Sequence, residues 1–317
     1  MRIATFNLEN LDLPLGNRAA ILRPALARLN ADVLCLQEVN GQHIRGQSGR
    51  HLLALDALLE GTAYATFHRA STSAAGSASA VDVHNLVTLS RYPIQHQRQV
   101  HHTLVAALEG QLATAIPKPV TASPIRFDRP ILATESDISG KVLHVLNVHL
   151  RAPLATAIPG GKIAPFTWKS VSQWAEGFYL SGVKRSGQAL ELRLIIDAAM
   201  DGDPNALIVA AGDFNAEDHE TPLRIVTGST EDTGNRELTN RAMVVLDRAI
   251  DLTRRFSILH HGRPQMVDHI VASHALYGHF RAIDVHNEAL GDEAIGFAKN
   301  VAAMGSYHAA VVAEFDL

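Results

Sequence analysis

Asp213 and Asn215 are a carboxylate and an amide whose types and spacing could support catalysis. They follow a short apolar run, residues 206–209, and the glycine at position 212. Side chains two positions apart on a strand point to the same face, so both are expected to emerge together at the end of a buried strand. A carboxylate that accepts a proton, beside an amide that stabilises an oxyanion, suits phosphoryl chemistry. The alternative is that the two residues only form the turn that ends the strand.

Polar residues also lie at the ends of other apolar segments that are predicted to be strands. Each of these segments begins or ends with a carboxylate, an amide or an imidazole. Such groups are hard oxygen and nitrogen donors, which suit Mg²⁺ or Mn²⁺ better than zinc bound through sulfur. The residues concerned are Asn7 and Glu9, Glu38, Asn147 and His149, Asp213 and Asn215, and Asp268 with His308. The sequence therefore predicts a site for a hard divalent cation where strand ends meet.

The elements that must position these residues are spread along the whole chain. Early strands alternate with helices and later strands pair as hairpins, which predicts two packed sheets with helices outside them. No internal repeat or linker divides the chain, so residues 1–317 are expected to form one domain. The predicted strands are 3–6, 33–36, 86–89, 129–134, 142–149, 206–209, 266–271, 282–285 and 309–315, and the predicted helices are 19–29, 52–59, 188–200 and 221–226.

Residues 151–187 are expected to be an insertion in this domain. The segment is rich in proline and glycine, and it contains both tryptophans of the chain, Trp168 and Trp174. The frequent prolines and glycines, together with these aromatic residues, favour a flap that lies beside the site and selects the substrate. The alternative is a packing loop whose tryptophans cover a helix.

Composition limits the location and the partners of the protein. The net charge is −4 and no block of like charges occurs, so a nucleic acid would have to be held by a local basic patch. With Cys35 as the single cysteine, no intramolecular disulfide can form. No stretch approaches ~18 consecutive apolar residues, so neither a membrane span nor stable membrane association is expected. A cytoplasmic monomer is expected, and a secreted form whose signal peptide has been removed is the alternative.

Seven short segments resemble the endonuclease/exonuclease/phosphatase superfamily, which includes DNase I. They occur in the family's order and span nearly the whole chain. The resemblance implies a four-layer α-β-β-α sandwich of the α+β class, with two mixed sheets flanked by helices. The segments are Thr5-Phe6-Asn7, Leu36-Gln37-Glu38-Val39, Leu89-Ser90-Arg91-Tyr92-Pro93-Ile94, Asn147-Val148-His149-Leu150, Gly212-Asp213-Phe214-Asn215, Val267-Asp268-His269-Ile270 and Ser306-Tyr307-His308.

The resemblance also implies a role for each site residue. The reaction would be in-line attack of an activated water on a phosphoester, with the metal offsetting charge on the phosphate oxygens. By this resemblance Glu38 is the main metal ligand with Asn7 and Glu9 nearby, Asp213 activates the water, Asn215 supports the nucleophile and the phosphate, His149 contacts the phosphate, and Asp268 holds His308. Substrate contacts are expected from Asn147, from Arg129 and from Tyr307, although Arg129 could equally be a surface arginine.

Tyr307 departs from the family pattern, because most members carry an aspartate at this position that helps to bind metal. A neutral phenol is a poorer magnesium ligand, so one tightly bound metal is expected and any second metal site should be weak. The alternative is that Tyr307 is a core aromatic residue that points away from the metal.

The substrate is left open by the sequence. A nuclease is favoured because several cations lie among aromatic residues in and near the insertion, namely Lys162, Lys169, Lys184 and Arg185. A phosphomonoesterase or a phospholipid or sphingomyelinase-type phosphodiesterase is the alternative enzyme. A catalytically weak binding module is the alternative from another functional class.

Overall fold

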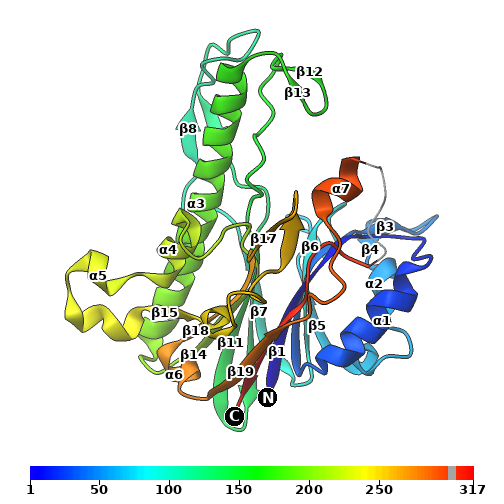
Figure 1. Cartoon of the computed structure of the whole chain (residues 1–317), viewed down its shortest axis with the longest axis vertical. Coiled ribbons are helices and arrows are strands. Elements are labelled where there is room, and N and C mark those ends of the chain that lie inside the picture. Colours follow the sequence, from blue (N-terminus) through cyan, green and yellow to red (C-terminus); the bar gives the residue numbers. More distant parts are fainter. Residues whose placement is uncertain (299–304) are drawn as a thin grey trace.

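The computed structural model of the protein describes residues 1–298 and 305–317, and its main strands form two sheets of six (Figure 1). In the first sheet, β1 and β2 are parallel and lie at the centre. The strand order of this sheet is β19 (Phe280–Val285), β20 (Val311–Phe315), β1 (Arg2–Leu11), β2 (Val33–Val39), β6 (Asn85–Ser90) and β5 (His68–Ser71).

The second sheet is also mixed, with β11 and β14 parallel at its centre. Its order is β15 (Met243–Val245), β18 (Asp268–Ser273), β14 (Leu207–Asp213), β11 (Lys141–His149), β10 (Ile131–Ile138) and β7 (Ile94–Val100). Strands β10 and β11 form the hairpin that the sequence predicts, and Ser139 and Gly140 adopt positive φ in its turn.

Helices cover the outer face of each sheet (Figure 1). On the first sheet, α1 (Arg18–Leu29) buries Leu22, Leu26 and Leu29, whose spacing places them on one helical face. Helix α2 (Leu53–Leu59) packs into the same apolar cluster. On the second sheet, α3 (Val171–Gly202) and α4 (Thr221–Thr227) form the corresponding cluster.

A third apolar cluster fills the space between the two sheets. It includes Val33 and Cys35 from the first sheet, and Val209, Ala211 and Ile270 from the second. The order of layers is therefore helix, sheet, sheet, helix, which confirms the predicted four-layer α+β sandwich. The remaining short elements are β3 (Gln42–His43), β4 (Arg50–His51), β16 (Ile258–His260), β17 (Arg263–Gln265), α5 (Thr230–Thr233), α6 (His274–Tyr277) and α7 (Glu293–Ala298).

Strand direction explains why polar residues meet at one edge of the sandwich. The parallel pairs β1/β2 and β11/β14 end at this edge, whereas β18 and β20 run antiparallel to β14 and β1 and begin there. Asp213 at the end of β14 is consequently the register partner of both His149 and Asp268. Residues that lie at ends and beginnings of strands in the sequence thus come together in space.

The second sheet carries a projection that we call the arm, formed by residues 104–127 and 150–187 (Figure 1). It contains the N-terminal half of α3 and the short strands β8 (Leu108–Gly110), β9 (Ser123–Ile125), β12 (Lys162–Ala164) and β13 (Thr167–Trp168). Helix α3 begins at Val171, so the predicted start of this helix at residue 188 is wrong, and much of the expected insertion is helical.

Polar side chains of α3 hold the loops of the arm against the helix. The buried Glu191 carboxylate accepts hydrogen bonds from the backbone N–H groups of residues 102–105. Glu176 accepts from the backbone N–H groups of Ala113 and Thr114. Gly177 has no side chain, and a Cβ at this position would overlap the carbonyl oxygen of Thr156. The arm is therefore fastened to α3 by carboxylate–backbone hydrogen bonds and by close backbone packing.

Candidate active site

Asp213 lies at the centre of the polar edge and is almost completely buried. Its Oδ2 atom accepts hydrogen bonds from Asn7 Nδ2 at 3.0 Å and from Asn215 Nδ2 at 3.1 Å, and its Oδ1 atom accepts from the Asn215 backbone N–H at 2.8 Å. Burial, together with the neighbouring Asp268 carboxylate, raises the pKa of Asp213 to about 7. A carboxylate of this pKa can exchange a proton near neutral pH.

Gly212 allows β14 to approach β11 closely enough to form this centre. Its φ is +155°, and a Cβ would overlap the carbonyl oxygen of Val148. The glycine before Asp213 is thus required by a close backbone contact between the two strands.

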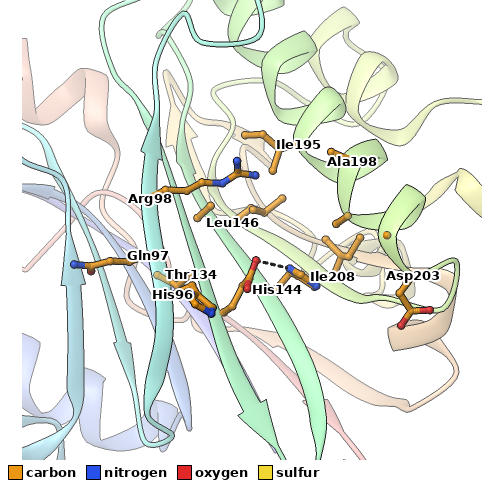
Figure 2. Close-up of a pocket in the computed structure, with 14 residues that line it drawn as sticks. His96, Gln97, Arg98, Thr134, His144, Leu146, Ile195, Ala198, Asp203 and Ile208 are labelled. Atoms are coloured by element: carbon orange, nitrogen blue, oxygen red, sulfur yellow. Dashed lines mark ion pairs between the residues drawn. The ribbon is translucent and has the colours of Figure 1, made fainter.

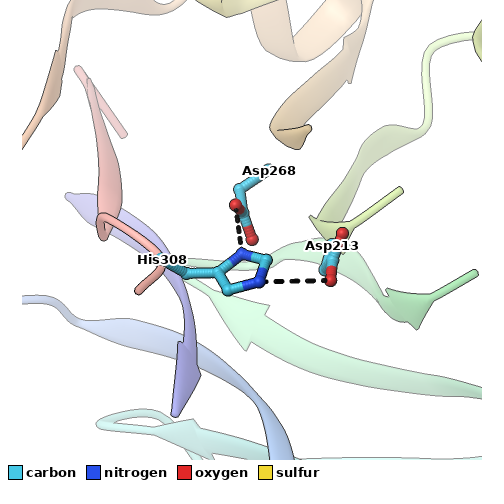
Figure 3. Close-up of side chains that lie close together, drawn as sticks. All are labelled: Asp213, Asp268 and His308. Atoms are coloured by element: carbon cyan, nitrogen blue, oxygen red, sulfur yellow. Dashed lines mark hydrogen bonds and ion pairs between the residues drawn. The ribbon is translucent and has the colours of Figure 1, made fainter. Parts of the chain in front are cut away.

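The His308 ring lies between Asp268, which holds it by a hydrogen bond, and Asp213 (Figure 3). Its Nδ1 atom lies 2.8 Å from Asp268 Oδ2, and its Nε2 atom lies 4.0 Å from Asp213 Oδ2. Burial lowers the pKa of His308, but the carboxylates of Asp268 and Asp213 outweigh burial and raise it to about 10. His308 is therefore a cation at neutral pH, and its Nε2–H group points toward the centre.

Glu38 lies at the edge of the same centre, at the end of β2. Its Oε1 atom is 3.4 Å from Asn7 Nδ2 and 3.6 Å from His149 Nε2, and its Oε2 atom accepts from the Asn10 backbone N–H at 3.0 Å. Its backbone has a φ of +58°, a left-handed conformation that costs energy for a residue with a side chain. The surrounding hydrogen bonds hold Glu38 in this conformation, which fixes the direction of its carboxylate.

Glu9 and Asn215 also have positive φ, at +46° and +49°. Burial raises the pKa of Glu9, whose Oε2 atom accepts from the Tyr307 backbone N–H at 2.7 Å. The Glu9 backbone N–H donates to Asn7 Oδ1 at 2.9 Å. Three non-glycine residues of the predicted site, Glu38 included, thus share a strained backbone, which is common where function constrains geometry.

His149 is a buried, neutral imidazole. Burial and the nearby Arg129 guanidinium lower its pKa well below the ordinary value. Its Nε2 atom lies 3.4 Å from Asp213 Oδ2 and 3.6 Å from Glu38 Oε1, so a proton on Nε2 faces both carboxylates. Its Nδ1 atom is buried without a hydrogen-bond partner among the described residues.

His84 belongs to this centre, although no strand-end pattern marks it. Its Nδ1 atom lies 2.7 Å from Arg129 Nη2, its Nε2 atom lies 3.0 Å from Asn10 Oδ1, and the ring is 3.8 Å from the Glu38 carboxylate. The residue directly precedes β6 and has a φ of +60°. Its position before Asn85 and the apolar run of β6 is the only signal that the sequence offers.

Asn147 does not reach the open side of the centre. Its side chain is fully buried between the sheets, where it accepts from Gln37 Nε2 at 2.9 Å and donates to the carbonyl oxygen of Val87 at 2.9 Å. The amide thus joins the two sheets. This corrects the expectation that Asn147 binds substrate, because its hydrogen-bonding groups are engaged inside the protein.

Tyr307 also differs from its expected position. Its ring packs beside Gly291 and Gly296, where added Cβ atoms would overlap it, and only 8% of the residue is exposed. The backbone N–H of Tyr307 donates to Oε2 of Glu9, a predicted metal ligand, at 2.7 Å. This placement favours the alternative of a buried aromatic residue over a phenol that binds the metal.

The donors of this centre fit a hard divalent cation. One potential ligand atom each of Asp213, Asp268 and His308 lies within 4.8 Å of the others. Because the protonated His308 has no free nitrogen lone pair, the carboxylate oxygens are the donors for a cation here. Asp268 Oδ1 is buried without a hydrogen-bond partner in the part of the chain that the structure describes, which leaves a lone pair for a cation or a water. Glu38 adds a third carboxylate nearby, and all these donors are oxygen atoms.

A hollow of about 550 Å³ lies elsewhere, on the outer face of the second sheet beside the C-terminal part of α3 (Figure 2). It contains an ion pair between His144 Nδ1 and Glu135 Oε1 at 3.3 Å. The residues that line this hollow include none of the predicted site residues. It is therefore separate from the centre around Asp213.

Solved structures share this fold at low sequence identity. Truncated TDP2 from Caenorhabditis elegans is 14% identical, with a TM-score of 0.58 and coverage of 100% of this chain and 97% of that one. The 3′ phosphatase NExo from Neisseria, bound to a product DNA hairpin, is 14% identical, with a TM-score of 0.53 and coverage of 100% of both chains. An AP endonuclease from Archaeoglobus fulgidus is 16% identical, with a TM-score of 0.54 and coverage of 100% of both chains.

Sequence comparison identifies the family. No curated protein sequence matches the chain significantly. A sequence model of the Endonuclease/Exonuclease/phosphatase family matches residues 4–308, which include every residue of the centre described above. Members of this family are metal-dependent hydrolases of phosphoester bonds, among them nucleases and phosphatases. The chain belongs to the Endonuclease/Exonuclease/phosphatase family.

Proposed function

We propose that the protein is a phosphodiesterase that depends on Mg²⁺ or Mn²⁺ and attacks the phosphorus atom in line with an activated water. The observation that carries this proposal is the environment of Asp213. A buried carboxylate with a pKa of about 7 lies 4.0 Å from Nε2 of the cationic His308. Asn7 Nδ2 and His149 Nε2 each lie close to both this carboxylate and the Glu38 carboxylate. This combination provides a base, a positive charge and a cation ligand around one point.

Glu38 is the residue that we propose as the main metal ligand, with Glu9 and Asn7 beside it. A divalent cation bound there would polarise the phosphate and offset the charge that develops on its oxygens. The Asn7 amide, which donates to both Glu38 and Asp213, holds the two carboxylates at a fixed spacing.

Asp213 is the proposed acceptor of the water's proton. The side-chain amides of Asn7 and Asn215 donate to its Oδ2 atom and hold the carboxylate in one orientation. Asp268 fixes the proton on Nδ1 of His308, so that the Nε2–H group is available to the oxygens of the phosphate. Neutral His149 and the Arg129 guanidinium supply further donors on the same side.

Nucleic acid is the substrate class that we propose first, as the sequence favours. Three of the four cations behind that preference are engaged within the protein, among them Lys162, whose Nζ donates to the Pro165 carbonyl oxygen at 2.7 Å. Lys184 Nζ lies 3.1 Å from Asp128 Oδ1, and Arg185 donates to the Asn215 carbonyl oxygen. A phospholipid diester is the second candidate, because apolar side chains are exposed on the arm.

Turnover of bis-p-nitrophenyl phosphate tests the reaction class without assuming a biological substrate. Activity should require added Mg²⁺ or Mn²⁺, should disappear in EDTA, and should fall by at least about a hundredfold in Asp213→Asn, because the base is removed. Asp203→Asn, which changes an exposed carboxylate at the end of α3, is the matched control. Full metal-independent turnover, or full activity of Asp213→Asn, would refute the proposal.

Competition then separates the substrate classes. An oligonucleotide that inhibits turnover and is itself cleaved supports a nuclease. Cleavage of a phospholipid in vesicles, with no effect of the oligonucleotide, supports the second candidate instead.

A further inference from the structure

The arm ends in a tip where large apolar side chains face solvent. We define the tip as the loop 111–122, the hairpin of β12 and β13, and the first turn of α3 (Figure 1). The exposed fractions are 94% for Val120, 92% for Phe166, 80% for Val171 and 71% for Ile163. Single exposed apolar residues are ordinary, but four in one small projection mark an interaction surface.

The loops of the tip are held together by specific contacts. The Ile116 backbone N–H donates to the Pro159 carbonyl oxygen at 2.9 Å, and Gln173 Nε2 donates to the Thr114 carbonyl oxygen at 3.1 Å. The apolar residues therefore come from one built projection, although Val120 and Phe166 lie far apart in the sequence.

The charge of the arm differs in sign from the charge of the whole chain. The arm contains seven lysines and arginines and two glutamates, Glu109 and Glu176, whereas the complete chain has a net charge of −4. Its cations are Lys118, Arg126, Arg151, Lys162, Lys169, Lys184 and Arg185, of which Arg151 and Lys184 pair with Asp128. A projection that is both apolar and cationic fits an anionic lipid surface, where apolar groups enter the interface and cations bind headgroups.

Both tryptophans of the chain lie on the arm and support the same partner. Lys162 Nζ is 5.0 Å from the centre of the Trp168 ring, and Trp174 is 43% exposed. Tryptophan prefers membrane–water interfaces, because its ring is apolar while its N–H group is polar. A nucleic acid would use the cations but would leave the aliphatic side chains of Val120, Ile163 and Val171 in water.

We propose that the tip of the arm docks the protein peripherally on an anionic lipid surface. In the part of the chain that the structure describes, no helix is long and apolar enough to cross a bilayer, so contact would be confined to the interface. The arm leaves the core directly after His149, so docking would bring the catalytic edge toward the same surface. The exposed apolar residues of the tip come from separate segments, so no continuous apolar stretch in the sequence marks this surface.

Vesicle co-sedimentation of the complete chain tests the docking independently of catalysis. The wild type should bind vesicles of phosphatidylcholine with phosphatidylserine, and should bind vesicles of phosphatidylcholine alone more weakly. The double variant Val120→Asp/Phe166→Asp should bind at least about tenfold more weakly, because it places two charges at the interface. Leu252→Asp, at an 83% exposed position outside the arm, is the matched control and should bind like the wild type.

Folding is checked by circular dichroism and by turnover of bis-p-nitrophenyl phosphate, which the tip substitutions should leave unchanged. The proposal is overturned if the wild type does not bind anionic vesicles at low salt, or if the double variant binds as well as the wild type. It is also overturned if sedimentation velocity shows a dimer that Phe166→Asp dissociates, with no vesicle binding, because the tip would then join two copies.

Discussion

The guanidinium Nη2 atom of Arg129 lies 2.7 Å from the Nδ1 atom of His84. An arginine can only donate, so Nδ1 must be the acceptor, and the proton of the neutral imidazole must lie on Nε2. The Nε2–H group in turn donates a hydrogen bond to Asn10 Oδ1 at 3.0 Å. Burial and the Arg129 charge both lower the pKa of His84, which keeps the ring neutral. We infer that His84 is a positioning residue for Arg129.

His84→Ala should reduce kcat/KM for the diester by about tenfold, and Arg129→Ala by up to about a hundredfold, because a charge-assisted hydrogen bond contributes about 1.5–3 kcal/mol. If His84 acts through Arg129, adding His84→Ala to Arg129→Ala should have little further effect. His68→Ala, on an exposed part of β5, is the control. Losses that simply add in the double variant would show that His84 acts without Arg129.

Glu38→Gln should remove most of the metal affinity and most of the activity while leaving the fold intact. The substitution preserves the shape of the side chain and removes the charge that a hard cation requires. Calorimetric titration with Mg²⁺ or Mn²⁺ measures the affinity, and Glu60→Gln, which changes an exposed carboxylate at the end of α2, is the control. Undiminished turnover by Glu38→Gln in EDTA would exclude a metal role for this residue.

Asp268→Asn distinguishes a carboxylate that holds His308 from one that binds the cation. As a partner of the imidazole, Asp268 should affect kcat by about a hundredfold or more while KM and metal affinity stay nearly constant. Asp268 Oδ1 has no hydrogen-bond partner among the described residues and lies close to Asp213, so Asp268 could also be a ligand of the cation. A large loss of metal binding in the calorimeter, with Asp203→Asn unchanged, would assign Asp268 to the cation.

A buried ion pair beside the site should make stability depend on pH. His269 Nδ1 lies 2.7 Å from Asp247 Oδ2, and its Nε2 atom lies 2.9 Å from the carbonyl oxygen of Ala216, next to Asn215. Both ring nitrogens face acceptors, so the ring must carry both protons. Burial lowers the pKa of His269, but Asp247 and Ala216 outweigh burial and raise it.

Because the folded pKa of His269 is raised, its stabilising contribution is complete below the unfolded value of about 6.5 and is lost as pH rises through the folded pKa. Burial raises the pKa of Asp247, but His269 and Arg255 outweigh burial and lower it, so its contribution is lost only as pH falls through that lowered value. Urea unfolding from about pH 5 to about pH 9 should therefore show an alkaline decline that His269→Gln reduces. His219→Gln, at an exposed position, should keep the full decline, and an equal pH slope in all three proteins would contradict this account.

The sequence predicts the strand ends of this centre better than it predicts the loops. Glu38 and Asp213 border long apolar runs, and the polarity of the strands then brings them to one edge. His84 could not be found this way, because its partners are distant in the sequence: Asn10 lies near the end of β1, and Arg129 lies in the loop before β10. The start of α3 cannot be predicted from apolar periodicity, because glycines such as Gly177 and several aromatic residues interrupt the pattern. Hydrogen bonds between α3 and the loops of the arm, which the sequence does not reveal, stabilise this part of the helix.

A bend before β20 accounts for the position of Tyr307. His308 directs its imidazole to Asp268, and the bend gives the preceding Tyr307 a different direction. Its ring lies beside Gly291 and Gly296 instead. The buried ring of Tyr307 is therefore expected to contribute to stability.

Tyr307→Ala should lower the free energy of unfolding by about 2–4 kcal/mol, because removing a buried ring leaves a cavity beside the two glycines. The metal affinity of the folded protein should change little, since the backbone N–H that bonds Glu9 is retained. Tyr179→Ala, at a 65% exposed position on α3, is the control and should change the unfolding free energy by less than about 0.5 kcal/mol. Urea denaturation measures the first quantity and calorimetric titration the second. A stable Tyr307→Ala protein with altered Mg²⁺ affinity would show that the phenol reaches the metal after all.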